Sequence, residues 1–161
     1  MNARMIIHMS VEQNKAIVSK FFEELWNNRN FDLADELFAT DCVTHQLRSG
    51  NEVVSLPRGP EVVKRHVAEW LTAFPDLSFA VEQTIADADR VVSRAVMQGT
   101  HTGSWNGIAP TGKLVSIRMI VIQRIAKGKI AEDWVLVEAL GLLQQLELVE
   151  PTEEIFARGA R

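Results

Sequence analysis

The chain has 161 residues, 47% of them hydrophobic, which is enough for one domain with its own core. Its net charge of −4 comes from interspersed acidic and basic residues, so the chain lacks an extended basic surface and nucleic-acid binding is disfavoured. The single cysteine, Cys42, excludes an intrachain disulfide, and no run approaches the ~20 apolar residues of a membrane span. We therefore expect one domain over residues 1–161, located in the cytoplasm, without a membrane or nucleic-acid partner.

The first half of the chain predicts three helices and one loop. Apolar residues recur at three-and-four spacing, the pattern of helices with one buried face. Ser10 and Gln13 have the spacing of a capping box before the first helix, and the proline after Gly59 begins the third. The expected helices cover residues 11–28, 32–38 and 60–74, and the polar segment 41–57 is interpreted as a loop.

After Pro75 the apolar spacing changes to the alternation of strands. Short turns at residues 87–89 and 127–128 predict antiparallel hairpins. Helices first and a meander afterwards indicate an α+β fold, in which a curved antiparallel sheet closes over the N-terminal helices. The expected strands cover residues 77–86, 91–98, 115–125 and 130–137, within a core of about 12–148, and the charged tail 151–161 is expected to be frayed.

Several sequence blocks follow one another in a particular order and spacing, namely residues 31–45, 58–60, 73–77, 99–103, 110–112, 128–138 and 140–146. Together they resemble the SnoaL-like polyketide cyclases, also called predicted ester cyclases, of the nuclear-transport-factor-like superfamily. No single block is diagnostic, but their order and spacing are. The resemblance implies a cone-shaped, cystatin-like fold with an apolar pocket between sheet and helices. It also implies a small hydrophobic ligand, no cofactor, and a homodimer formed through the sheet.

The catalytic acid is where this chain departs from the resemblance. The cyclases have an aspartate one residue after the position that matches Trp134, and here that residue is Val135. Strand alternation puts Asp133 on the same face as Val135, about 7 Å along the strand, so Asp133 is the best substitute acid. An alternative of similar weight pairs Asp133 with Arg118 or Arg124 on the neighbouring strand.

Two histidines match pocket positions of the family, His45 after the second helix and His101 between two glycines. Taken alone, a loop histidine is more often structural or solvated, and tryptophans are more often core or interface residues than ligand platforms. His66 is interpreted as a solvated helix residue. The candidate catalytic residues are thus Asp133 and His45, and the candidate substrate-binding residues are His101, Val135, Trp26, Trp70, Met119 and Val121.

Other chemistries lack their signatures. No histidines or cysteines have the spacing of metal ligands, and no glycine-rich loop joins a strand to a helix to hold a nucleotide. A Gly-x-Ser-x-Gly elbow is missing, and Cys42 has no adjacent basic residue that would lower its pKa. Acid/base catalysis in an apolar pocket, without metal or cofactor, is the remaining route.

Three functions stay open at this point. The first is a cyclase or isomerase that acts on a flat, hydrophobic carbonyl compound by acid/base catalysis. The second is a binding protein that kept the pocket and lost the acid, which Val135 favours. The third is epoxide hydrolysis, which requires an Asp-Arg-Asp set, of which Asp133 and Arg118 would supply two.

Overall fold

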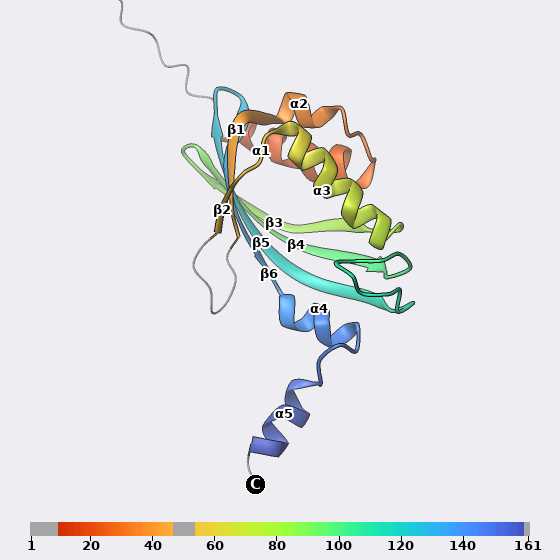
Figure 1. The fold of residues 1–161 in the computed structure, drawn as a ribbon. Helices are drawn as coiled ribbons and strands as arrows, with labels where there is room; N and C mark the ends of the chain where they lie inside the picture. Colours follow the sequence, from red (N-terminus) through yellow and green to blue (C-terminus); the bar gives the residue numbers. More distant parts are fainter. Residues whose placement is uncertain (1–9, 47–53, 160–161) are drawn as a thin grey trace, which may run out of the picture.

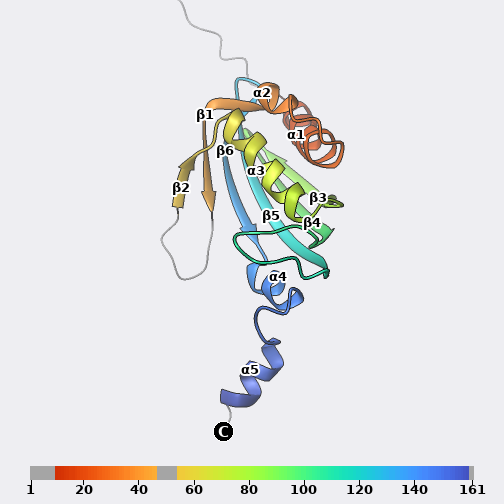
Figure 2. The ribbon, with the colours of Figure 1, turned by 45° about the vertical axis from the view of Figure 1, so that its right-hand side comes forward.

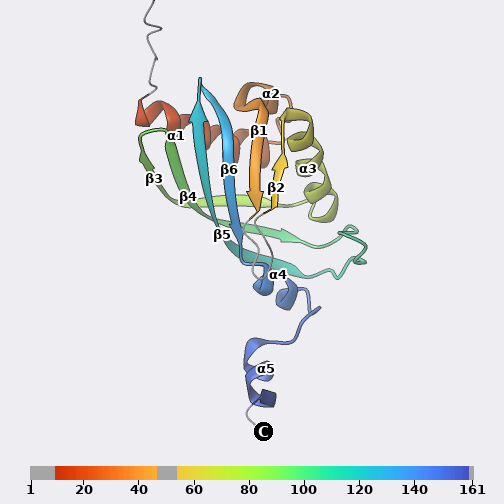
Figure 3. The same cartoon turned by 60° about the vertical axis from the view of Figure 1, so that its left-hand side comes forward.

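A six-stranded sheet is the centre of the structure, a computed structural model that describes residues 10–46 and 54–159 (Figure 1). The strand order is β2-β1-β6-β5-β4-β3, and neighbouring strands run antiparallel except for the parallel pair β1 and β6 (Figure 3). The strands are β1 Phe38–Gln46, β2 Val54–Pro57, β3 Ser78–Asp87, β4 Arg90–Thr100, β5 Leu114–Ala126 and β6 Lys129–Val137.

The helices confirm the predicted helical first half. The Ser10 N–H donates to Gln13 Oε1 at 2.8 Å and the Gln13 N–H donates to Ser10 Oγ at 3.1 Å, so the predicted capping box is present. The first predicted helix is one α-helix followed by a π-helical segment. The helices are α1 Val11–Lys20, η1 Phe21–Asn27, α2 Leu33–Leu37, α3 Pro60–Ala73, α4 Ala139–Gln145 and α5 Thr152–Gly159.

One face of the curved sheet, called the inner face below, is covered by the N-terminal helices and α3 (Figure 2). Side chains on β4 alternate along the strand, with Val91, Ser93, Ala95 and Met97 buried on this face. Val91, Ala95 and Met97 pack with helix residues such as Phe22 into one core. The predicted α+β fold with a curved sheet over N-terminal helices is therefore confirmed.

The interpretation of residues 41–57 as a loop is wrong for the described part of that segment. Residues 38–46 and 54–57 form β1 and β2, which pair with each other, while residues 47–53 lie outside the described residues. β1 also pairs with β6 in parallel, so the sheet is not purely antiparallel. This pairing joins residues about 90 positions apart, and local alternation carries no signal for such a contact.

The C-terminal tail, which is expected to be frayed, contains a helix. Residues 152–159 form the helix α5, none of whose residues is buried, and Phe156 is 72% exposed. α5 lies beyond α4, away from the sheet (Figure 1). Across the described ranges, no helix is both long and apolar enough to cross a membrane.

The outer face of the sheet carries exposed apolar side chains. Ile120 on β5 and Leu136 on β6 are register partners, and they are 42% and 47% exposed. Such a patch is typical of a surface that meets a partner. The expected homodimer through the sheet stays a prediction.

Asn27 joins the N-terminal helical segment to the edge strand β3. Its Nδ2 donates to the Phe79 carbonyl at 2.9 Å, and its Oδ1 accepts from the Phe79 N–H at 2.8 Å. We predict that Asn27→Ala lowers the free energy of unfolding by about 1–3 kcal/mol, because both backbone groups of Phe79 lose a partner. Asn28→Ala is the control, since the Asn28 side chain is exposed and bonds only to Glu24, and its effect should stay within about 0.5 kcal/mol. Equal urea midpoints for the two variants would contradict this role of Asn27.

Candidate functional site

A cavity lies between the inner face of the sheet and the helices, with about 500 Å³ of atom-free volume when its mouth is included. Its walls are mainly aromatic. Trp26 and Phe79 meet edge to face with ring centroids 5.0 Å apart, and Phe22 lies 5.8 Å from Phe79. Phe21 and Phe38 complete this wall at a centroid distance of 5.8 Å. Rigid aromatic walls favour a flat, apolar ligand.

Further lining residues come from the central strands of the sheet. Met119 and Val121 on β5 and Val135 on β6 line the cavity, as does Trp26, so four candidate substrate-binding residues come together there. Val135 and Val121 are register partners. Both of these paired positions are therefore apolar, including Val135, which the resemblance leads us to match with the acid of the cyclases.

Asp133 is the carboxylate of the cavity, and it is 4% exposed. Burial raises its pKa, and the Thr44 hydroxyl, the Arg58 guanidinium and His45 oppose this rise. No hydrogen bond of normal geometry satisfies Asp133 Oδ1. A buried carboxyl with a raised pKa is a stronger base than an exposed one, which suits it to acid/base chemistry near neutral pH.

Arg58 brings a positive charge into the same cavity. It follows β2 and precedes α3, and its N–H donates to the Cys42 carbonyl at 2.7 Å, which holds this turn against β1. Burial lowers the pKa of Arg58, whereas the nearby Asp133 raises it. In the sequence, residues 58–60 indicate a helix start and one block of the family resemblance, and only the structure places the Arg58 guanidinium in the cavity.

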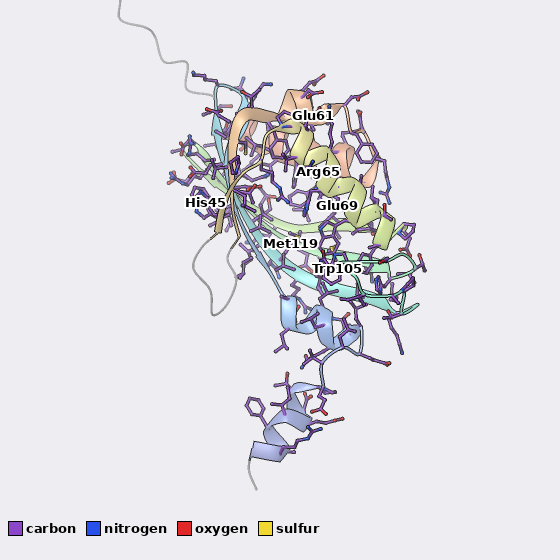
Figure 4. All side chains as sticks on the ribbon, in the orientation of Figure 1. His45, Glu61, Arg65, Glu69, Trp105 and Met119 are labelled. Atoms are coloured by element: carbon purple, nitrogen blue, oxygen red, sulfur yellow. The ribbon has the colours of Figure 1, made fainter. Side chains whose placement is uncertain are left out.

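His66 also lines the cavity, which corrects its interpretation as a solvated helix residue. Burial, and the charge of Arg58, lower its pKa to about 3, so the ring is neutral at physiological pH. Exposed Glu61, Arg65 and Glu69 lie along the outward side of α3 (Figure 4). The nearness of Arg65 and Glu69 in the sequence favours the solvated interpretation of His66. The spacing from Val63 to His66, three residues along the apolar stripe, is the signal that places it inward.

His45 lies on the outer face, away from this cavity. Its Nε2 is 2.8 Å from Glu132 Oε1, and its ring stacks on Trp134 at 4.9 Å. The register explains this, because His45 lies beside Trp134 while the preceding residue, Thr44, lies beside Asp133 on the inner face. In Figure 4, His45 and Met119 are labelled on opposite sides of the strands.

Neither arginine proposed as a partner of Asp133 pairs with it. Arg124 Nε donates to Glu132 Oε2 at 2.9 Å, and the exposed Arg118 side chain belongs to the outer face. The β5 residue opposite Asp133 is Gln123. The alternative that Asp133 is neutralised by a cross-strand arginine is therefore wrong.

His101 and Trp70 do not line the cavity. His101 is fully buried, and its Nδ1 accepts from the Thr111 N–H at 3.3 Å while its ring lies 5.1 Å from Phe74. Trp70 lies 5.3 Å from Trp105 in the same aromatic group. These contacts attach the loop after β4 to the end of α3.

The remaining nucleophile of the site is inert. Burial, together with Asp133, raises the pKa of the Cys42 thiol to about 12, so thiolate chemistry has no support at neutral pH. Within residues 10–46 and 54–159, no three His, Cys, Asp or Glu side chains come together as a metal-binding group.

The comparison with known proteins agrees with this geometry. The family model for SnoaL-like polyketide cyclases matches residues 16–146. The chain belongs to the SnoaL-like polyketide cyclase family. It is 38% identical over 80 residues to the aklanonic acid methyl ester cyclase AcmA of Streptomyces galilaeus. That match covers 48% of this chain and 56% of AcmA, so the chain spans about half the length of this curated relative.

Two solved structures extend the similarity over most of the chain. AclR of Streptomyces galilaeus, a candidate hydroxylase, matches with a TM-score of 0.76 and 26% identity, covering 94% of this chain and 92% of AclR. IdmH of Streptomyces antibioticus, a candidate polyketide cyclase, matches with a TM-score of 0.72 and 26% identity, covering 84% of this chain and 99% of IdmH. The cone-shaped sheet over helices is the architecture that these relatives share.

The raised pKa of Asp133 implies a particular dependence of folding stability on pH. Below the unfolded value of 3.8 the carboxyl is protonated in both states, so it has no pH-dependent effect. Above it, the unfolded chain ionises more readily than the folded one, and the folded state loses stability as pH rises. We therefore predict that the stability of Asp133→Asn relative to wild type increases between about pH 4 and pH 7. Urea unfolding of both proteins across this range measures the difference, and a difference that falls with pH would contradict the burial of this carboxyl.

Proposed function

We propose that this member of the family is a cofactor-independent cyclase or isomerase in which Asp133 is the acid/base group. The observation that carries the proposal is a carboxyl that is almost fully buried, has a raised pKa and lies in an aromatic cavity. Desolvation of this kind adjusts a carboxyl to proton transfer near neutral pH. The substrate class that suits the cavity is a flat, hydrophobic ketone or ester.

The proposed reaction needs only one proton-carrying group. The Asp133 carboxylate removes a proton from the carbon next to a ligand carbonyl, which leaves an enolate and a protonated carboxyl. The enolate carbon attacks a second carbonyl of the same ligand, a carbon–carbon bond forms, and the carbonyl electron pair moves to oxygen. The carboxyl proton then passes to that oxygen, so Asp133 returns to its starting state and no electrons are gained or lost.

Arg58 and His66 supply polar contacts around that proton transfer. A buried guanidinium is suited to stabilise the negative charge that develops on the enolate oxygen, because little solvent screens it. His66, which is neutral, adds one donor and one acceptor without a competing charge. In this scheme Arg58 stabilises the negative charge on the enolate oxygen, and Asp133 transfers the proton.

The curated relative supports a substrate class for the proposal. AcmA, by its name, is a cyclase of aklanonic acid methyl ester. A related aromatic ester or ketone would match the aromatic walls formed by Trp26, Phe79 and their neighbours.

A binding protein without catalysis is the second candidate function. Val135 and Val121 support it, since the position of the family's acid is apolar and so is its cross-strand partner. Epoxide hydrolysis has less support. Arg58, rather than Arg118, lies near Asp133, and among the described residues that line the cavity Asp133 is the one carboxylate, so an Asp-Arg-Asp set is not assembled.

Deuterium exchange tests the proton transfer. We predict that the wild-type protein catalyses uptake of deuterium at the methyl group of 2-acetylnaphthalene in D₂O, followed by NMR. Asp133→Asn should reduce the catalysed rate on the order of 10²-fold or more, because the amide cannot accept the proton. Binding of the ketone, measured by ligand-observed NMR, should persist in the variant.

Asp41→Asn is the matched control, because Asp41 is an exposed aspartate on β1, and its exchange rate should equal that of wild type. Exchange that survives in Asp133→Asn would overturn the role of Asp133. If wild type binds the ketone without exchange, the binding function is correct. In that case Val135→Asp, which restores a carboxyl at the family's position, should introduce the exchange.

A further inference from the structure

Beside the cavity, four buried polar side chains meet on the inner face of the sheet. Thr44 on β1, Asp133 on β6, Gln123 on β5 and Ser93 on β4 are each between 0% and 4% exposed. We call these four residues the polar cluster. They come from four neighbouring strands, β1, β6, β5 and β4, which lie side by side in Figure 3.

The register makes these side chains neighbours. Thr44 pairs with Asp133 across the β1–β6 boundary, and Asp133 pairs with Gln123 across the β6–β5 boundary. Ser93 pairs with Val121, two residues before Gln123, so it lies diagonally from the amide. Paired residues on one face of a sheet have Cβ atoms about 4.5–5.5 Å apart, and diagonal ones are also within reach of a long side chain.

The cluster is unusual because its buried polar atoms make no hydrogen bond of normal geometry to the residues that the structure describes, although the Thr44 hydroxyl is close enough to Asp133 to lower the pKa of that carboxyl. These buried atoms are Thr44 Oγ1, Ser93 Oγ, Asp133 Oδ1 and both polar atoms of Gln123. Burying polar groups in this way costs free energy, and native proteins nearly always provide a partner from the chain, from water or from a ligand. Four such residues on adjacent strands indicate one shared partner group rather than unrelated defects.

The cluster is connected to the ligand cavity. The Asp133 side chain lines the cavity and belongs to the cluster, and Val121, the register partner of Ser93, lines the cavity as well. Thr44, Ser93 and Gln123 do not themselves line the cavity, so a ligand group reaches the cluster at Asp133, whose register partners are Thr44 and Gln123. Asp133 thus joins the cluster to the mainly apolar cavity.

The donors and acceptors of the cluster define the group that fits. Gln123 offers an amide donor and a carbonyl acceptor, the two hydroxyls can do either, and Asp133 Oδ1 accepts when it is ionised. A ligand hydroxyl both donates and accepts, so it can satisfy both kinds of atom. A ligand carbonyl only accepts and would leave Gln123 Oε1 unpaired, while a carboxylate would face the Asp133 carboxylate.

We propose that the polar cluster is a binding subsite for a hydroxyl group at the buried end of an aromatic ligand, with Gln123 as its main specificity-determining residue. This inference rests on the proposal that the cavity is the ligand site, and it goes further by naming an oxygen substituent that the ligand must carry. Orientation follows from it: the hydroxylated end enters first and the remaining rings stay among the aromatic walls.

A pair of probes of similar shape tests the subsite without any turnover. 2-Naphthol carries a hydroxyl where 2-methylnaphthalene carries a methyl group. Wild type should bind 2-naphthol about 10-fold or more tightly than 2-methylnaphthalene by ligand-observed NMR, since a site with unpaired polar atoms rejects the analogue that lacks the hydroxyl. Gln123→Met should reduce this ratio of the two affinities to about 3-fold or less, because it weakens the binding of 2-naphthol alone.

Gln98→Met is the matched control, because Gln98 is exposed on β4. The ratio of the two probe affinities in this variant should equal that of wild type. Thr44→Val provides a second variant of nearly unchanged shape, and it should lower the ratio as well. Gln123→Met should also melt at or above the wild-type temperature, because the ligand-free protein loses only an unpaired amide.

Equal affinity of wild type for the two probes would overturn the subsite and would show that water alone occupies the cluster. A lower melting temperature of Gln123→Met with an unchanged probe ratio would assign Gln123 a structural role and also overturn it. Because these measurements follow binding and not exchange, an inactive Asp133 would leave their outcome unaffected. The subsite and the proposed reaction can therefore fail separately.

Discussion

The parallel pairing of β1 with β6 is the contact on which the cavity depends. It places Thr44 beside Asp133 and His45 beside Trp134, so strand alternation directs the first pair inward and the second outward. It also covers β6 with a further strand, which leaves Asp133 in the interior of the sheet rather than at an edge. From β1 the chain returns through β2 to Arg58 and α3, and this return brings the guanidinium to the same cavity.

The apolar walls act on three ionisable groups at once. Burial raises the pKa of Asp133, lowers that of Arg58 and lowers that of His66 to about 3, since each change favours the neutral form. The attraction between Asp133 and Arg58 offsets part of this cost for both. A base, a positive charge and a neutral donor thus share one poorly solvated space, which is the kind of arrangement that supports proton transfer from carbon.

Whether the protein catalyses a reaction or only binds its ligand depends on where along β6 the inward carboxyl lies. Val135 is the residue expected from the resemblance to match the family's acid, and the inward carboxyl of Asp133 lies two residues earlier, about 7 Å away along β6. In the proposed reaction, the carbon that loses its proton lies correspondingly closer to the polar cluster around Gln123. Such a shift changes which part of the ligand reacts while the fold stays the same.

The sequence by itself determined the helices of the first half, four of the six strands and the shared face of Asp133 and Val135, because these depend on local spacing and alternation. Only the tertiary structure decided what surrounds them. The nonlocal β1–β6 register sent His45 outward, the return to α3 brought Arg58 and His66 inward, and the β5 register gave Asp133 the neighbour Gln123. Contacts between distant segments leave no periodic signal in a single sequence, and these contacts are what make the site.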